Sequence, residues 1–68
     1  MTKELKKKIA TGARKHLFDE CFKRIYALNI SLKQSYNGVL SDVRTDFPEF
    51  EPYKNYESFK QSYYKRRE

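Results

Sequence analysis

The segment LKQSYNGVLSDVRTDF (residues 32–47) carries the clearest structural signal in this chain. Its large apolar residues are spaced by four, three, one, three and four positions, at Leu32, Tyr36, Val39, Leu40, Val43 and Phe47. Such spacing places them on one face of an α-helix. Asn29 or Ser31 can cap its start. Pro48 ends it, because proline disfavours the helical conformation of the preceding residue. We predict a helix over residues 32–46, with Gly38 marking a close approach by another helix.

A longer amphipathic pattern precedes this helix. Apolar residues recur every four positions from Leu5 to Cys21, and the pattern continues to Leu28. On a helix they form one apolar stripe, which is widened by Phe18 and Phe22. Gly12 interrupts it and costs about 1 kcal/mol relative to alanine in a helix. We therefore expect a firm helix over residues 13–28. Residues 1–12 are expected to form a basic N-terminal arm or a frayed helix start.

The C-terminal third contains a turn and then another helix. Two prolines four residues apart make residues 47–54 a turn rather than a strand. The aromatic residues of this turn are Phe47, Phe50 and Tyr53. We expect their rings to close the core; the alternative is that they form an exposed patch for a partner protein. The following segment, residues 55–67, has Asn55 as a candidate cap and an apolar seam at Tyr56, Phe59 and Tyr63.

Together these patterns predict an all-α fold, a compact three-helix domain with an extra N-terminal turn, spanning residues 1–68. A chain of 68 residues buries a smaller share of its surface than a typical domain. Its stability must come from well-packed helices or from self-association, so a homodimer is one expectation. The single cysteine, Cys21, cannot form an intramolecular disulfide, which favours a cytoplasmic location.

The sequence indicates neither a membrane protein nor an enzyme. No apolar stretch is long enough for a signal peptide or a membrane span. A helix lying on a membrane surface over residues 3–28 would show the same stripe as a core helix, and we favour the core. His16 lacks partners for a metal site, and Cys21 lies in the apolar stripe as an inert thiol. Tyr63 or Tyr64 as a nucleophile would need a preorganised pocket. We expect no catalysis, no cofactor, no metal and no small-molecule substrate.

Positive charge is concentrated at both ends of the chain. The formal net charge is +6, from 15 Lys and Arg and nine Asp and Glu. Residues 1–24 hold eight bases and three acids, residues 25–53 two bases and four acids, and residues 54–68 five bases and two acids. Such a distribution suits a polyanionic partner. The two ends form one footprint only if folding brings them to the same side.

The outward side of the helix over residues 55–67 carries hydrogen-bonding and cationic side chains, the types that contact base edges and phosphates. A solvated basic helix end is the plainer alternative, because cations there also favour the macrodipole. The candidate DNA contacts on this helix are Ser58, Lys60, Gln61, Tyr64, Lys65, Arg66 and Arg67. The candidate phosphate contacts near the N-terminus are Lys6, Lys7, Lys8, Arg14 and Lys15.

Over roughly residues 13–67, this order of helices with a basic last helix resembles the helix-turn-helix DNA-binding proteins. The resemblance implies double-stranded DNA as partner, the last helix in the major groove, and a role as transcriptional regulator or accessory factor. Small proteins of phages and other mobile elements look similar. The loop at residues 47–54 departs from the family's tight turn, which puts the crossing angle in doubt. Two alternatives remain open: a helical protein-interaction module or inhibitor, and an RNA binder that stacks Tyr63 and Tyr64 on unpaired bases.

Overall fold

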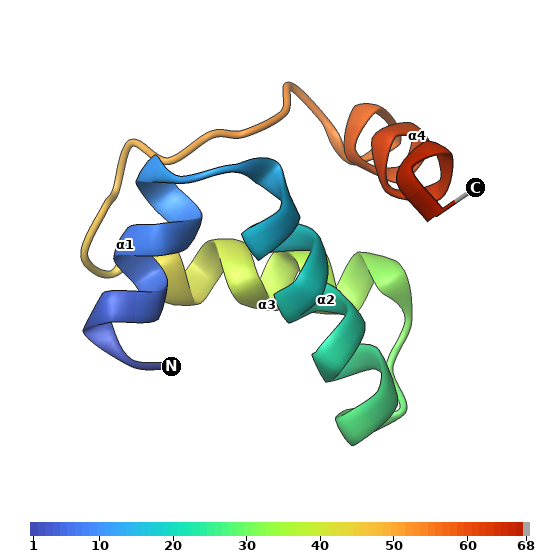
Figure 1. The fold of residues 1–68 in the computed structure, drawn as a ribbon, viewed down its shortest axis with the longest axis horizontal. Helices are drawn as coiled ribbons and strands as arrows, with labels where there is room; N and C mark the ends of the chain where they lie inside the picture. The colour runs from blue at the N-terminus through green and yellow to red at the C-terminus, as the bar shows by residue number, and fades with distance from the viewer. Residues whose placement is uncertain (68) are drawn as a thin grey trace.

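The computed structural model describes the backbone of residues 1–67 and the side chains of residues 1–65. Within the described backbone the chain forms α-helices and no strand, which confirms the all-α prediction. The helices are α1 (Lys3–Thr11), α2 (Arg14–Leu28), α3 (Leu32–Arg44) and α4 (Tyr56–Arg67) (Figure 1). The predicted count of three helices is wrong, because residues 3–11 form a helix of their own.

Gly12 separates α1 from α2. At its start, α1 is capped by Thr2, whose hydroxyl accepts from the Leu5 amide at 3.2 Å. At its end, the Gly12 amide donates to the Lys8 carbonyl at 2.8 Å, and a Cβ on Gly12 would lie only 2.4 Å from that oxygen. Any other residue there would force the backbone to move. Ile9 is 1% exposed, so α1 belongs to the core rather than being a frayed start.

A three-residue turn, residues 29–31, joins α2 to α3. Asn29 adopts the left-handed conformation with φ 53°, a conformation that asparagine tolerates better than most residues. Ser31 then caps α3 in a capping box with Gln34, whose side chain accepts from the Ser31 amide. The left-handed conformation of Asn29 therefore determines where α2 ends, and the capping box determines where α3 begins.

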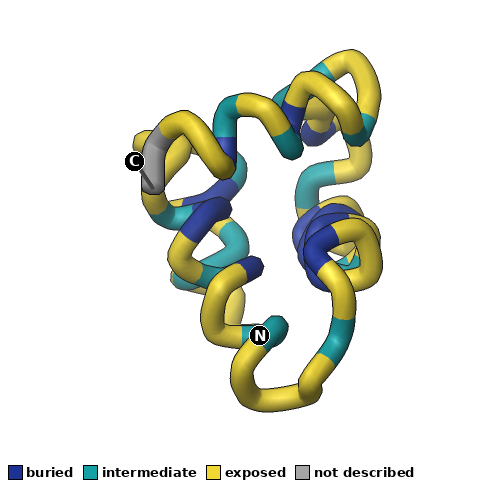
Figure 2. The backbone as a smooth tube through the Cα atoms, turned by 90° about the vertical axis from the view of Figure 1, so that its right-hand side faces the viewer, coloured by how far each residue is buried: buried dark blue, intermediate teal, exposed yellow. Residues whose placement is uncertain are grey.

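The central helix is α3, whose buried residues are Leu32, Ser35, Tyr36, Val39, Leu40 and Val43. Figure 2 shows the buried segments on the sides of the helices that face the middle of the molecule. The close approach predicted at Gly38 is made by a side chain of α2, since a Cβ on Gly38 would lie 3.0 Å from Arg24 Nη1. Arg24 in turn binds Glu20 on its own helix and Asp42 on α3. This arginine therefore ties the two helices together.

Two arginines hold the loop over residues 45–55 against the helices. Arg44 Nε donates to the Phe50 carbonyl at 2.8 Å. Arg14 Nη2 donates to the Pro52 carbonyl at 3.0 Å, and its guanidinium lies 5.2 Å from the centre of the Tyr53 ring. Phe50 is buried, while Phe47 and Tyr53 are partly buried against the core. The prediction that the loop aromatics close the core is confirmed.

Helix α4 is attached through its aromatic seam. Asn55 caps it as predicted, accepting from the Ser58 amide at 2.9 Å. Phe59 is fully buried and Tyr63 is 3% exposed. The Phe59 ring stacks on Tyr36 of α3 with centroids 4.0 Å apart, and it lies 5.8 Å from Phe18 of α2. Two rings therefore fix the side of α4 that faces the core.

The apolar stripe of α2 ends earlier than the sequence pattern indicates. Leu17, Phe18 and Cys21 are buried, but Leu28 is 62% exposed and Phe22 is 37% exposed. The last turn of α2 extends past the end of the core, so the continuation of the stripe to Leu28 is wrong.

Phe50→Ala tests the role of the loop. Because the ring is 9% exposed and packs in the core, its removal is expected to lower the free energy of unfolding by about 3 kcal/mol. Glu51→Ala, at an exposed neighbour, is expected to change it by less than about 0.5 kcal/mol. Urea denaturation followed by circular dichroism measures both. Equal stability of Phe50→Ala and wild type would show that the loop is a surface feature.

Candidate nucleic-acid interface

The outward side of α4 is formed by residues that the aromatic seam turns away from the core. Ser58, Gln61, Tyr64 and Lys65 are exposed, and Lys60 is half-buried at the edge of this side. Glu57 is also exposed and lies in the first turn, where its negative charge interacts favourably with the positive end of the helix macrodipole. The predicted contacts Arg66 and Arg67 lie outside the residues whose side chains the structure describes.

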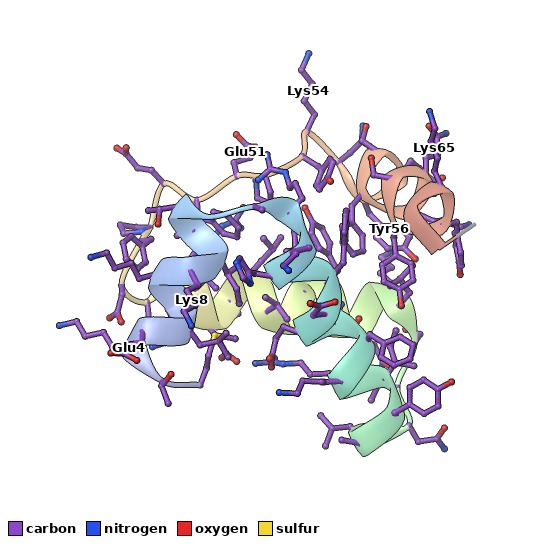
Figure 3. The ribbon with its side chains drawn as sticks, in the orientation of Figure 1. Glu4, Lys8, Glu51, Lys54, Tyr56 and Lys65 are labelled. Carbon is purple, nitrogen blue, oxygen red and sulfur yellow. The ribbon has the colours of Figure 1, made fainter. Side chains whose placement is uncertain are left out.

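Lys54 adds a cation that the sequence analysis left out of the site. It stands directly before the Asn55 cap and is exposed. Figure 3 shows the side chains of Lys54 and Lys65 extending from the same side of the molecule. The sequence contained a signal for Lys54, because this residue directly precedes Asn55, the predicted cap. It therefore had to lie at the start of the helix that carries the other candidate contacts.

The three lysines predicted as phosphate contacts on α1 differ in their surroundings. Lys6 Nζ lies 3.5 Å from Asp46 Oδ2 and donates to Thr45 Oγ1 at 2.9 Å, so it ties α1 to the end of α3. Lys7 and Lys8 are exposed, and neither makes an ion pair with any described side chain. Only these two keep their ammonium groups available to a partner.

The two predicted contacts at the start of α2 also differ. Arg14 is bound to the loop through Pro52 and Tyr53, as described above. Lys15 is exposed in a first turn that contains no acid, at a helix start with no side-chain cap. Its ammonium group adds to the positive end of the α2 macrodipole.

The lysines of α1 do not share one patch with the described outward residues of α4. Helices α1 and α4 lie at opposite ends of the longest axis, along which the molecule measures 29 Å (Figure 1). The labelled Lys8 and Lys65 lie correspondingly far apart in Figure 3. The fold thus brings together Lys54 and the outer side of α4, and it leaves Lys7 and Lys8 elsewhere.

Ion pairing removes several carboxylates from competition with a polyanion. Glu20 and Asp42 are bound by Arg24, and Asp46 is bound by Lys6. Burial lowers the pKa of Arg24, but its hydrogen bonds to Asp42 and Glu20 outweigh this and raise it overall. These paired acids lie on α2, on α3 and in the loop that follows α3, so none of them lies on α4.

His16 and Cys21, considered above for metal binding and catalysis, both lie on α2. Cys21 is fully buried, and burial raises the pKa of its thiol to about 11, although a hydrogen bond with Ser35 lowers it in part. His16 is half-buried beside a hollow of about 430 Å³ between α1 and α2 that both Asp19 and Lys23 line. Among the described residues, no group of three or more His, Cys, Asp or Glu is placed to hold a metal ion.

The structure also bears on the RNA and membrane alternatives. Tyr63, one of the two rings considered for stacking on unpaired bases, is 3% exposed, so its faces are covered; Tyr64 is 51% exposed. The apolar sides of α1 and α2 face the core through Ile9, Leu17 and Phe18, which supports the core explanation of their stripe. None of the described helices has the length and apolar character needed to span a bilayer.

Comparison of the chain with protein-family models, with curated proteins and with solved structures finds no match.

The raised pKa of Cys21 predicts a loss of stability at alkaline pH. The thiol ionises near 9 when the chain is unfolded and near 11 when it is folded. Its contribution is therefore fully present below pH 9 and is lost as pH rises from 9 to 11. The expected loss by pH 10.5 is on the order of 2 kcal/mol, because one pKa unit corresponds to about 1.4 kcal/mol.

Urea denaturation of wild type and Cys21→Ala at pH 8 and pH 10.5 isolates this contribution, since other groups titrate equally in both proteins. The variant is expected to lose less stability between the two pH values. Equal losses would show that the thiol ionises as readily inside the fold as outside it.

Proposed function

We propose that this protein binds double-stranded DNA through the outward side of α4, with Lys54 beside it. The observation that carries the proposal is the orientation of α4. Phe59 and Tyr63 hold one side in the core, and the opposite side presents Ser58, Gln61 and Lys65 to solvent. A helix held in this way offers its polar side chains in a fixed arrangement.

The chemistry of this side suits a major groove. An α-helix with its side chains is about 10–12 Å across, which matches the width of about 12 Å of the major groove, and the 12 residues of α4 extend over about 18 Å. Gln61 can pair in bidentate fashion with adenine, and Lys65 and Lys54 can neutralise phosphates or bind guanine. Glu57 can accept from the amino group of cytosine. Because these groups can contact base edges, we expect the outward side of α4 to distinguish DNA sequences in addition to attracting the phosphate backbone.

The net charge of +6 provides the sequence-independent part of the affinity. A small basic domain of this kind fits a transcriptional regulator or an accessory factor of a mobile element, with the last helix in the groove as in the helix-turn-helix proteins. Lys7 and Lys8 lie at the other end of the molecule, so their contribution depends on whether the duplex bends around it.

Gln61→Ala tests base readout. After selection of a preferred duplex from a random library, the variant is expected to bind it about 5- to 150-fold more weakly, corresponding to roughly 1–3 kcal/mol. Lys60→Ala is expected to act in the same direction. Binding to unrelated duplexes should change less for both, as measured by fluorescence anisotropy.

Ser41→Ala, an exposed change on α3, is the matched control and should leave both affinities unchanged. If Gln61→Ala and Lys60→Ala leave the affinity for every duplex unchanged, α4 does not read bases. If wild type selects no duplex and binds only another protein or RNA, the proposal is wrong.

Salt dependence separates the two basic ends. Replacing Lys54 and Lys65 together by Ala is expected to reduce the slope of log affinity against log salt by about 0.9 per lost phosphate contact. Replacing Lys7 and Lys8 together should weaken binding to all sequences alike and reduce the slope less, because α1 lies at the opposite end. Lys6 is kept, since its removal would break the pair with Asp46. The reverse order of slopes would place the interface on α1.

A further inference from the structure

Helix α4 contains one acid, Glu57, on the side that the proposed function assigns to DNA. Its carboxylate is exposed and makes no ion pair with any described side chain. Glu20, Asp42 and Asp46, by contrast, are bound by basic side chains of the fold. A negative charge without a basic neighbour, on a surface that binds a polyanion, weakens binding unless it has a specific partner.

The position of Glu57 on α4 places it in one row with two other candidate contacts. Gln61 and Lys65 follow at intervals of four residues, and all three are exposed. Four residues of an α-helix rise by about 6 Å, while successive base pairs of DNA are about 3.4 Å apart. When α4 lies along the groove, Glu57 and Gln61 therefore meet base pairs about two steps apart.

The carboxylate of Glu57 accepts hydrogen bonds and donates none. In the major groove, the polar groups of guanine and thymine are acceptors, and adenine presents an acceptor beside its amino group. Cytosine presents an amino donor. Of the four bases, cytosine therefore has the groove edge that best fits a carboxylate.

We propose that Glu57 is a specificity-determining residue of α4, which selects cytosine within about two base pairs of the position that Gln61 contacts. The inference rests on the proposed binding of DNA through α4. At cytosine the carboxylate accepts from the amino group, whereas at any other base it faces an acceptor while the phosphates repel it. Glu57 thus lowers the affinity for unmatched duplexes, while Lys54 and Lys65 raise it for every duplex through phosphate contacts.

A purely structural role for Glu57 is the alternative that the test must separate. An acid in the first turn of a helix interacts favourably with the macrodipole whether or not DNA is bound. Glu4 occupies the equivalent position in α1, because it is exposed and lies in the first turn of that helix. It lies at the other end of the molecule from Lys65 (Figure 3). Glu4→Gln is therefore the matched control for Glu57→Gln.

Selection from a random duplex library, carried out with wild type and both variants, tests the proposal. Wild type is expected to select cytosine at a position near the one whose preference Gln61→Ala weakens. Glu57→Gln is expected to reduce the preference for cytosine there at least about fivefold and to shift it toward adenine, because glutamine can pair with adenine in bidentate fashion. Its affinity for unrelated duplexes should rise, because a negative charge is removed. Glu4→Gln should keep the wild-type preference.

Thermal melts by circular dichroism check that both variants fold, and both should lose a little stability because each lacks a first-turn acid. A selected site without cytosine near the Gln61 position, or the same base preference for Glu57→Gln and wild type, overturns the inference and leaves the proposed DNA binding intact. An equal shift of preference by Glu4→Gln also overturns it, since it would assign the effect to net charge. A wild type that selects no duplex overturns the proposed function and this inference with it.

Discussion

The packing of Phe59 is the interaction on which the rest of the structure depends. Its ring contacts Phe18 from α2, Tyr36 from α3 and Tyr53 from the loop, as well as Tyr63 on its own helix. Aromatic pairs in such offset and tilted arrangements stabilise beyond the area they bury. Because one side chain joins three separate parts of the chain, the orientation of α4 is fixed by the same contacts that complete the core.

Arginine side chains stabilise the fold of this protein in addition to contributing positive charge. Arg14 and Arg44 donate to carbonyl groups of the loop, and Arg24 joins α2 to α3 through two carboxylates. The planar guanidinium, with several donors, suits such bridging roles. Exposed lysines, with compact and fully hydrated charges, supply the cations left for a partner. The count of basic residues therefore overstates the positive charge that is available to a partner.

The surface divides into regions with different physical character. The side bearing Lys54 and Lys65 attracts anions, and its attraction weakens with salt. The end of α2 exposes Tyr26 and Leu28, and no residue between Arg24 and Lys33 is charged.

The sequence by itself determined the helices, their caps and the core side of α3 and α4, because apolar spacing and local hydrogen bonds act over a few residues. It predicted Asn55 as a cap, gave Ser31 as one of two candidate caps beside Asn29, and predicted the burial of Phe59 and Phe50. The interruption at Gly12 was visible in the sequence, but only the tertiary structure decided that residues 3–11 form a helix packed on the core. It also decided that Leu28 lies beyond the core and that Lys6 and Arg14 have partners in the fold. These outcomes depend on where the helices lie relative to one another, and contacts such as those of Lys6 and Arg14 join residues 38 to 40 positions apart. No local pattern specifies such a contact.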